Sequence, residues 1–177
     1  LLEDSAKSLE AKLDTSKSAY EVFEFILERL RGYFIDQGVK PDTFEAVRSI
    51  KPTRLLDFSD RIQAVQRFRS LAEADSLAAA NKRISNILKK AKQVNNKVDI
   101  NLFSEAAEQE LHKQVTAVEK IVAPKFKSRH YAEALTDLAQ LRSTIDTFFD
   151  DVMVMDENEN VRSNRIALLA NVNRLFS

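Results

Sequence analysis

Residues 81–90 read Asn81-Lys-Arg-Ile-Ser-Asn-Ile-Leu-Lys-Lys90. On an α-helix, which turns by about 100° per residue, the apolar side chains of this region fall on one face. They are Leu77, Ala80, Ile84, Ile87, Leu88 and Ala91. The opposite face carries an amide and several cations: Lys82, Asn86, Lys89 and Lys90, with Arg83 at its edge. The pattern predicts a helix that packs against a core on one side and faces solvent on the other.

The same region contains no acidic residue. Between Ser76 and Val98 the sequence has six Lys or Arg residues and no Asp or Glu. The whole chain has 27 cationic and 27 acidic residues, so this excess of positive charge is local. Solvated helix faces usually mix the two signs. A helix face that carries cations alone suits a polyanion such as a nucleic acid.

The composition favours an all-α fold. The 177 residues include only 2 Gly and 3 Pro, and sheets with tight hairpins or glycine-rich phosphate loops need more glycine. Gly38 is expected to end the first helix and Pro124 the fifth. We expect helices at 18–37, 41–50, 53–71, 76–93, 104–123, 130–155 with a break near Ser143, and 161–176. The sequence therefore predicts a helical bundle.

Two regions are expected along the chain. Residues 1–50 read as a polar leader and a helical linker from an upstream region. Residues 51–177 read as one helical domain that is trimmed at its C-terminus.

No pattern in the sequence indicates catalysis. The chain lacks Cys, and its two histidines, His112 and His130, have no metal-binding partner at a suitable spacing. The adjacent carboxylates of Asp150 and Asp151 lie on different sides of a helix, so they do not form a catalytic pair. No apolar run approaches the roughly 18 residues of a membrane span. We expect a cytoplasmic, non-catalytic chain with no cofactor or metal of its own.

Five stretches together resemble one protein family. They are Phe23-Glu-Phe-Ile-Leu-Glu-Arg-Leu-Arg31, Pro52-Thr-Arg-Leu-Leu-Asp-Phe58, Ala79-Ala-Asn-Lys-Arg-Ile-Ser-Asn-Ile-Leu-Lys-Lys90, Phe148-Phe-Asp-Asp-Val-Met-Val-Met155 and Val161-Arg-Ser-Asn-Arg-Ile-Ala-Leu-Leu169. Their order and spacing resemble the C-terminal anticodon-binding region of the beta subunit of two-subunit bacterial glycyl-tRNA synthetases. The resemblance covers about residues 20–176, nearly the whole chain.

The resemblance implies a fold and a role. The fold would be a helical bundle similar to the anticodon-binding domain of arginyl-tRNA synthetase, a domain type marked by an Asp-Ala-Leu-Arg signature. Here the corresponding residues are Glu159-Asn160-Val161-Arg162, which keep only the apolar residue and the Arg. The chain would bind glycine tRNA in support of ATP-dependent glycylation. The alpha subunit, its partner in a heterotetramer, would hold the ATP and glycine site, and the full enzyme would use ATP and Mg.

Eight residues are expected to bind tRNA. Lysines are suited to phosphate oxygens, Arg83 can contact a phosphate or a guanine edge with two donors, and the amide of Asn86 can both donate and accept. Arg129 belongs to a second basic stretch with Lys125 and Lys127, which suits RNA or an ordinary helix entry equally. The set is Lys82, Arg83, Asn86, Lys89, Lys90, Arg129, Arg162 and Arg165.

Several of these residues also have a structural interpretation. Arg162 and Arg165 begin the last helix, where they can tie the helix start to acids such as Asp156. The apolar set Phe148, Phe149, Val152 and Met153 is expected in the core rather than in a stacking platform.

Two alternative functions stay open on the sequence alone. One is the same fold in an arginine-type synthetase, which the weak signature and the 81–90 stretch disfavour. The other is a helical protein-interaction module without RNA contact. In that case the acidic segment 143–160 would dock the alpha subunit or another basic partner.

Overall fold

In the part that the structure describes, the chain consists of helices joined by turns and loops. The computed structural model describes residues 15–91 and 94–176, and within these ranges it contains helices and no strand. The all-α prediction is therefore confirmed. The expected leader lies almost entirely in residues 1–14, outside the described residues.

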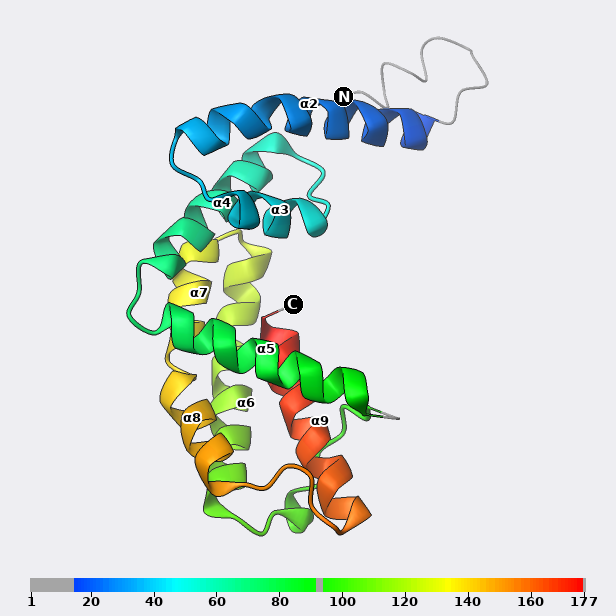
Figure 1. Ribbon diagram of the computed structural model, residues 1–177, viewed down its shortest axis with the longest axis vertical. Helices are drawn as coiled ribbons and strands as arrows, with labels where there is room; N and C mark the ends of the chain where they lie inside the picture. The colour runs from blue at the N-terminus through cyan, green and yellow to red at the C-terminus, as the bar shows by residue number, and fades with distance from the viewer. Residues whose placement is uncertain (1–14, 92–93, 177) are drawn as a thin grey trace. The chain divides into compact units, whose positions relative to one another are not determined.

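The chain forms two compact units, one ending at Gln66 and one beginning at Arg67. The first contains α2 (Thr15–Asp36), α3 (Pro41–Ser49) and most of α4 (Leu55–Arg69) (Figure 1). The rings of Phe34, Phe44 and Phe58 meet at the centre of this unit, with centroids 5.0–6.0 Å apart. Leu27 of α2 and Ile62 of α4 are buried in the same cluster.

The cluster also places most of α4 in the first compact unit. Phe58 and Ile62 are apolar residues of α4 that bury themselves against Leu27 and Phe44. The energy of burying such side chains joins α4 to α2 and α3. The predicted domain division after residue 50 stays a prediction.

Gly38 ends α2 as predicted. Its φ of +84° lies in the left-handed region, which glycine enters without a steric penalty. The amide of Val39 then donates to the carbonyl of Phe34 at 3.0 Å, the six-to-one hydrogen bond of a Schellman motif.

Among its described residues, the second unit contains five α-helices and one short 3-10 helix. Within it α6 packs against α7, α8 and α9, and α5 packs against α8 and α9 (Figure 1). Its fully buried side chains include Leu111, Leu138, Ile145, Phe148 and Leu168. The elements are α5 (Ala74–Lys90), η1 (Ile100–Leu102), α6 (Ala106–Lys127), α7 (Tyr131–Ala139), α8 (Arg142–Asp151) and α9 (Glu159–Leu175).

Helix α9 is the central element of this unit. Seven consecutive residues, 164–170, are buried, so the helix has no exposed side over that length. Two of the seven are polar and have partners. Asn164 accepts from the amide of Asp99 at 2.8 Å and donates to the Asp99 carbonyl at 2.9 Å, which fastens the connector before α6 to α9.

Some predicted helix ends are wrong. Helix α6 continues past Pro124 to Lys127, although a proline inside a helix removes one backbone hydrogen bond. The helix ends instead where Arg129 takes a left-handed conformation with φ of +64°. The amide of His130 then donates to the Lys125 carbonyl at 2.8 Å.

The basic helix and the region after it also differ in their bounds. Helix α5 begins at Ala74 and ends at Lys90, and residues 92–93 are outside the described ranges. The expected break near Ser143 occurs at Gln140–Leu141, between α7 and α8. Helix α8 ends at Asp151 rather than near Met155, so residues 152–158 form a loop before α9.

Candidate nucleic-acid interface

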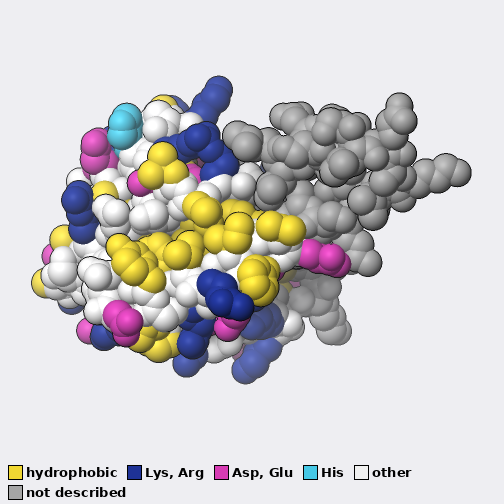
Figure 2. Space-filling model, turned by 90° about the horizontal axis from the view of Figure 1, so that it is seen from above, with side chains coloured by type: hydrophobic (Ala, Val, Ile, Leu, Met, Phe, Trp, Pro, Cys, Tyr) yellow, Lys and Arg dark blue, Asp and Glu magenta, His cyan; other side chains and the backbone are white. Residues whose placement is uncertain are grey.

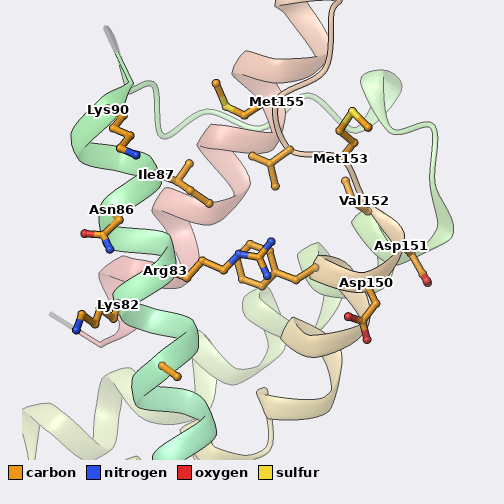
Figure 3. Close-up of a pocket in the computed structure, with 13 residues that line it drawn as sticks. Lys82, Arg83, Asn86, Ile87, Lys90, Asp150, Asp151, Val152, Met153 and Met155 are labelled. Atoms are coloured by element: carbon orange, nitrogen blue, oxygen red, sulfur yellow. The ribbon is translucent and has the colours of Figure 1, made fainter.

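A groove of about 940 Å³ opens between α5 and the chain segment that ends α8 and follows it (Figure 3). Helix α5 contributes three cations, an amide and two apolar side chains. The facing segment contributes one aromatic ring, two carboxylates and an apolar run. The lining residues are Ala79, Lys82, Arg83, Asn86, Ile87 and Lys90 on α5, with Phe149–Met155 opposite.

The cations of α5 face outward because its other side is in the core. Leu77 and Ile84 are buried, and Ile87 and Leu88 pack partly against the same cluster. The hydroxyl of Ser85 donates to the side-chain oxygen of Asn173 on α9 at 2.9 Å. The predicted apolar face of α5 is therefore confirmed, and Lys82, Arg83, Asn86, Lys89 and Lys90 are all exposed.

Arg83 and Phe149 lie against each other across the groove floor. The guanidinium carbon of Arg83 is 3.9 Å from the centre of the Phe149 ring, and Figure 3 shows the guanidinium over the ring. Phe149 in turn meets Phe148 edge-on at 5.7 Å between centroids. The core prediction is correct for Phe148, which is fully buried, and correct in part for Phe149, which is half-buried, packs against the same core cluster and also lines the groove.

The facing wall is an extended segment whose side chains alternate. Val152 has extended backbone angles, φ −112° and ψ 120°, and extended chains point successive side chains to opposite sides. Val152 and Val154 are accordingly buried, whereas Met153 is 73% exposed and Met155 is 63% exposed. The core prediction is thus correct for Val152 and wrong for Met153.

The groove lies within a region that matches a known family. Residues 77–177 match the family described as the DALR anticodon binding domain. The chain belongs to this family.

Named relatives are beta subunits of glycine–tRNA ligases. One from Photorhabdus laumondii is 44% identical over 177 residues, which cover 99% of this chain and 26% of the relative. One from Shewanella amazonensis is 44% identical over 97% of this chain and 25% of the relative. One from Pseudomonas aeruginosa is 47% identical over 93% of this chain and 24% of the relative. The chain spans about a quarter of the length of these curated relatives.

Arg165 of this DALR domain is buried, which fits its structural interpretation and not a direct contact with RNA. Its side chain is 3% exposed and pairs with Glu108, which is fully buried, at 2.9 Å. The same guanidinium donates to the Met153 carbonyl at 2.8 Å, to Asp156 at 2.9 Å and to the Ser104 hydroxyl at 2.8 Å. With its donors used in this way, Arg165 holds the 152–158 loop to α6 and α9.

Glu108 is charged because its partners compensate for its burial. Burial alone favours the neutral acid and would raise the pKa of Glu108. The hydrogen bond from Arg165 and those from the backbone amides of Glu105 and Ser104, each 2.9 Å long, oppose that effect. The net result is a pKa below the usual value of 4.5.

Arg162, the Arg of the degenerate signature, holds the same loop from its other end. Its guanidinium donates to the carbonyl of Asp156 at 2.6 Å and more weakly to that of Glu157 at 3.4 Å. Asn158 caps α9 with its side-chain oxygen, which accepts from the amide of Asn160 at 3.0 Å. The structural interpretation of Arg162 and Arg165 is therefore the one that the geometry supports.

The remaining predicted residues lie outside the groove. Lys89 is exposed on α5 but does not line it. Arg129 is at the C-terminal end of α6, the opposite end of that helix from Glu108. In the same stretch Lys125 pairs with Asp137 at 2.7 Å and with Glu133 at 3.4 Å. The two basic stretches therefore do not share one groove.

Two other features are absent from the described ranges, 15–91 and 94–176. These ranges contain no group of three or more His, Cys, Asp or Glu side chains placed to hold a metal ion. No helix there combines the length and the apolar character that crossing a bilayer requires. Sequence reasoning missed the apolar half of the groove, Phe149, Met153 and Met155, although the alternation of Val and Met in 152–155 indicates a wall with one exposed side.

Proposed function

We propose that this DALR domain binds the anticodon arm of glycine tRNA through the α5 groove. The observation that carries the proposal is the groove itself, where cations, an amide and apolar groups meet on one exposed surface. The position of this groove within the family match and the names of the relatives support the choice of glycine tRNA.

The side chains of the groove suit both the phosphates and the bases of an RNA loop. Lysine ammonium groups attract phosphate oxygens and release counterions on binding. Loop bases are unstacked, and proteins hold them by stacking and by hydrogen bonds to their edges. Lys82 and Lys90 supply the first kind of contact, Asn86 can supply edge hydrogen bonds, and the apolar side chains accept a base face.

The domain would contribute tRNA binding to a larger enzyme. We propose a cytoplasmic glycine–tRNA ligase in which this beta-subunit region works with an alpha subunit in a heterotetramer. ATP and Mg would be used by the whole enzyme, with the alpha subunit supplying the catalytic site. The 177-residue chain alone should then form no glycyl-adenylate, and ATP–pyrophosphate exchange by the purified chain would contradict this division.

Binding of tRNA transcripts tests the proposal directly. The 177-residue chain should bind a glycine tRNA transcript more tightly than transcripts that differ only in the anticodon, with an affinity that falls as salt rises. Equal affinity for all anticodon variants would show that this domain does not recognise the anticodon. A preference for an arginine anticodon would favour the arginine-type alternative.

A protein-docking role is favoured for the first unit by a separate observation. Three large side chains of α2 are exposed, Val22 at 43% and Phe25 and Tyr33 at 59% each. Figure 2 shows hydrophobic side chains in a band along α2. Exposed apolar bands of this kind mark protein contacts. Loss of co-purification with the alpha subunit in a Phe25→Ser, Tyr33→Ser variant would support docking there, and unchanged co-purification would exclude it.

A further inference from the structure

The pair formed by Arg83 and Phe149 has a geometry that a plain phosphate contact does not require. The guanidinium is exposed, yet it is held 3.9 Å from the ring centre. Within the described ranges no carboxylate forms an ion pair with Arg83, although Asp150 and Asp151 are close in sequence to Phe149. A cation over an aromatic face is attracted by the ring quadrupole, which holds the guanidinium against the ring.

Because Arg83 is an exposed residue, a guanidinium held against a ring in this way can offer its other face to a ligand. The N–H donors of the guanidinium lie around its edge. RNA-binding proteins stack unpaired bases on such planes. The surroundings suit a base better than a phosphate, because Ile87 lies beside the pair and Met153 and Met155 form the facing wall (Figure 3). Methionine adapts its shape to irregular apolar partners.

The two sides of the groove carry opposite charges. Lys82 and Lys90 line it along α5, whereas Asp150 and Asp151 line it at the end of α8. Phosphates are attracted to the first side and repelled from the second. A strand that binds here therefore runs its backbone along α5 and turns a base into the groove.

We propose that Arg83 and Phe149 form a stacking platform for one unpaired base of the RNA loop. Arg83 then acts through its plane as well as its charge, and Phe149 acts as a positioning residue that orients it. The inference rests on the proposed function and assigns that function's base-binding position.

A double-mutant cycle tests the platform. It combines the Arg83→Lys variant with the removal of one base from the RNA and compares the binding affinities. Lysine keeps the charge and loses the plane. The RNA is a set of glycine tRNA transcripts, each with one abasic residue in the anticodon loop. With the intact transcript, Arg83→Lys should weaken binding about tenfold, as expected for the loss of one stacked base. With the transcript that lacks the stacked base, the wild-type chain and the variant should bind equally.

Two further variants separate stacking from charge. Phe149→Leu keeps an apolar side chain and removes the ring, so it should give the same pattern as Arg83→Lys, with a thermal melt to verify folding. Lys82→Ala is the matched charge control. It should weaken binding to every transcript by one common factor and reduce the slope of log affinity against log salt by about one, whereas Arg83→Lys leaves that slope unchanged.

The outcomes distinguish this inference from the proposed function. An equal loss on every transcript for Arg83→Lys would make Arg83 a phosphate ligand and overturn the platform alone. Loss of alpha-subunit binding in these variants with unchanged RNA affinity would assign the groove to a peptide and overturn the platform. Failure of the wild-type chain to bind any tRNA would overturn both proposals.

Discussion

At the scale of single residues, Arg162 and Arg165, which the sequence offers either for RNA binding or for tying the start of the last helix, hold a loop. Arg165 is 3% exposed and joins α6, α9 and the 152–158 loop through Glu108, Asp156 and the Met153 carbonyl. A guanidinium with several donors in a fixed plane is suited to such a junction. The loop that Arg165 holds carries the methionines of the groove wall, so this buried residue supports the binding surface without reaching it.

Removing Arg165 should destabilise the second unit strongly. Arg165→Met leaves Glu108 charged, buried and without its main partner, which costs about 3–5 kcal/mol in comparable sites. The double variant Arg165→Met, Glu108→Gln removes the unpaired charge and should regain part of that loss. Urea denaturation of the three proteins measures this. A single variant as stable as the wild type would show that the pair contributes no stability.

The pKa of Glu108 gives the stability of the chain a predictable dependence on pH. Because the folded-state pKa lies below the usual value of 4.5, the unfolded chain binds more protons than the folded one in the acid range. The contribution of Glu108 is therefore complete above that usual value and is lost as the pH falls through the folded-state pKa. The stability difference between wild type and Glu108→Gln, measured from pH 7 to pH 3, should shrink on acidification. A constant difference would contradict the assignment.

At the scale of elements, α5 presents neighbouring lysines in different surroundings. Lys90 lines the groove, whereas Lys89 is exposed outside it. The two lysines carry the same charge and are adjacent in sequence. Comparing their variants therefore distinguishes a direct phosphate contact in the groove from long-range electrostatic attraction to the RNA. A helix turns by about 100° between neighbours, which is enough to place one of them at the groove and the other away from it.

This difference predicts unequal effects of two matched variants. Lys90→Ala should weaken binding to glycine tRNA and reduce the salt slope by about one, because one phosphate contact is lost. Lys89→Ala should change both quantities much less. Binding titrations at several salt concentrations measure the two slopes, and equal slopes would mean that the α5 cations act only through their summed field.

At the scale of the whole molecule, each unit has its own core. The first is built around Phe44 and Phe58, and the second around α6 and α9. The groove lies entirely in the second unit. The chain therefore separates a region that we propose to bind RNA from a region that presents an apolar surface.

Damage to the first core should leave the groove intact. Phe58→Ala removes a fully buried ring and should destabilise the first unit by about 3–5 kcal/mol. Amide hydrogen exchange should then increase in α2, α3 and α4 while α6 and α9 keep their protection. Affinity for glycine tRNA should not change, and a parallel loss of protection in α9 would show that the two units unfold together.

The helices and the exposed cations follow from local sequence. The spacing of Leu77, Ile84 and Leu88 places them on one side of α5 wherever the helix packs, so the outward position of Lys82 and Lys90 follows as well. Gly38 ends α2 for an equally local reason, its left-handed backbone. Such features depend only on residues a few positions away in the sequence, so the helical spacing of apolar residues predicts them.

The groove and the buried arginine depend on contacts between distant segments. Phe149 meets Arg83, and Arg165 meets Glu108, across 66 and 57 residues of chain. Residues 164–170 of α9 are buried on every side of the helix, so helical periodicity alone does not show that Arg165 is an interior residue. Whether a side chain at such a position binds RNA or holds a loop is settled by which helices pack around it, and that depends on the burial energy of the whole core.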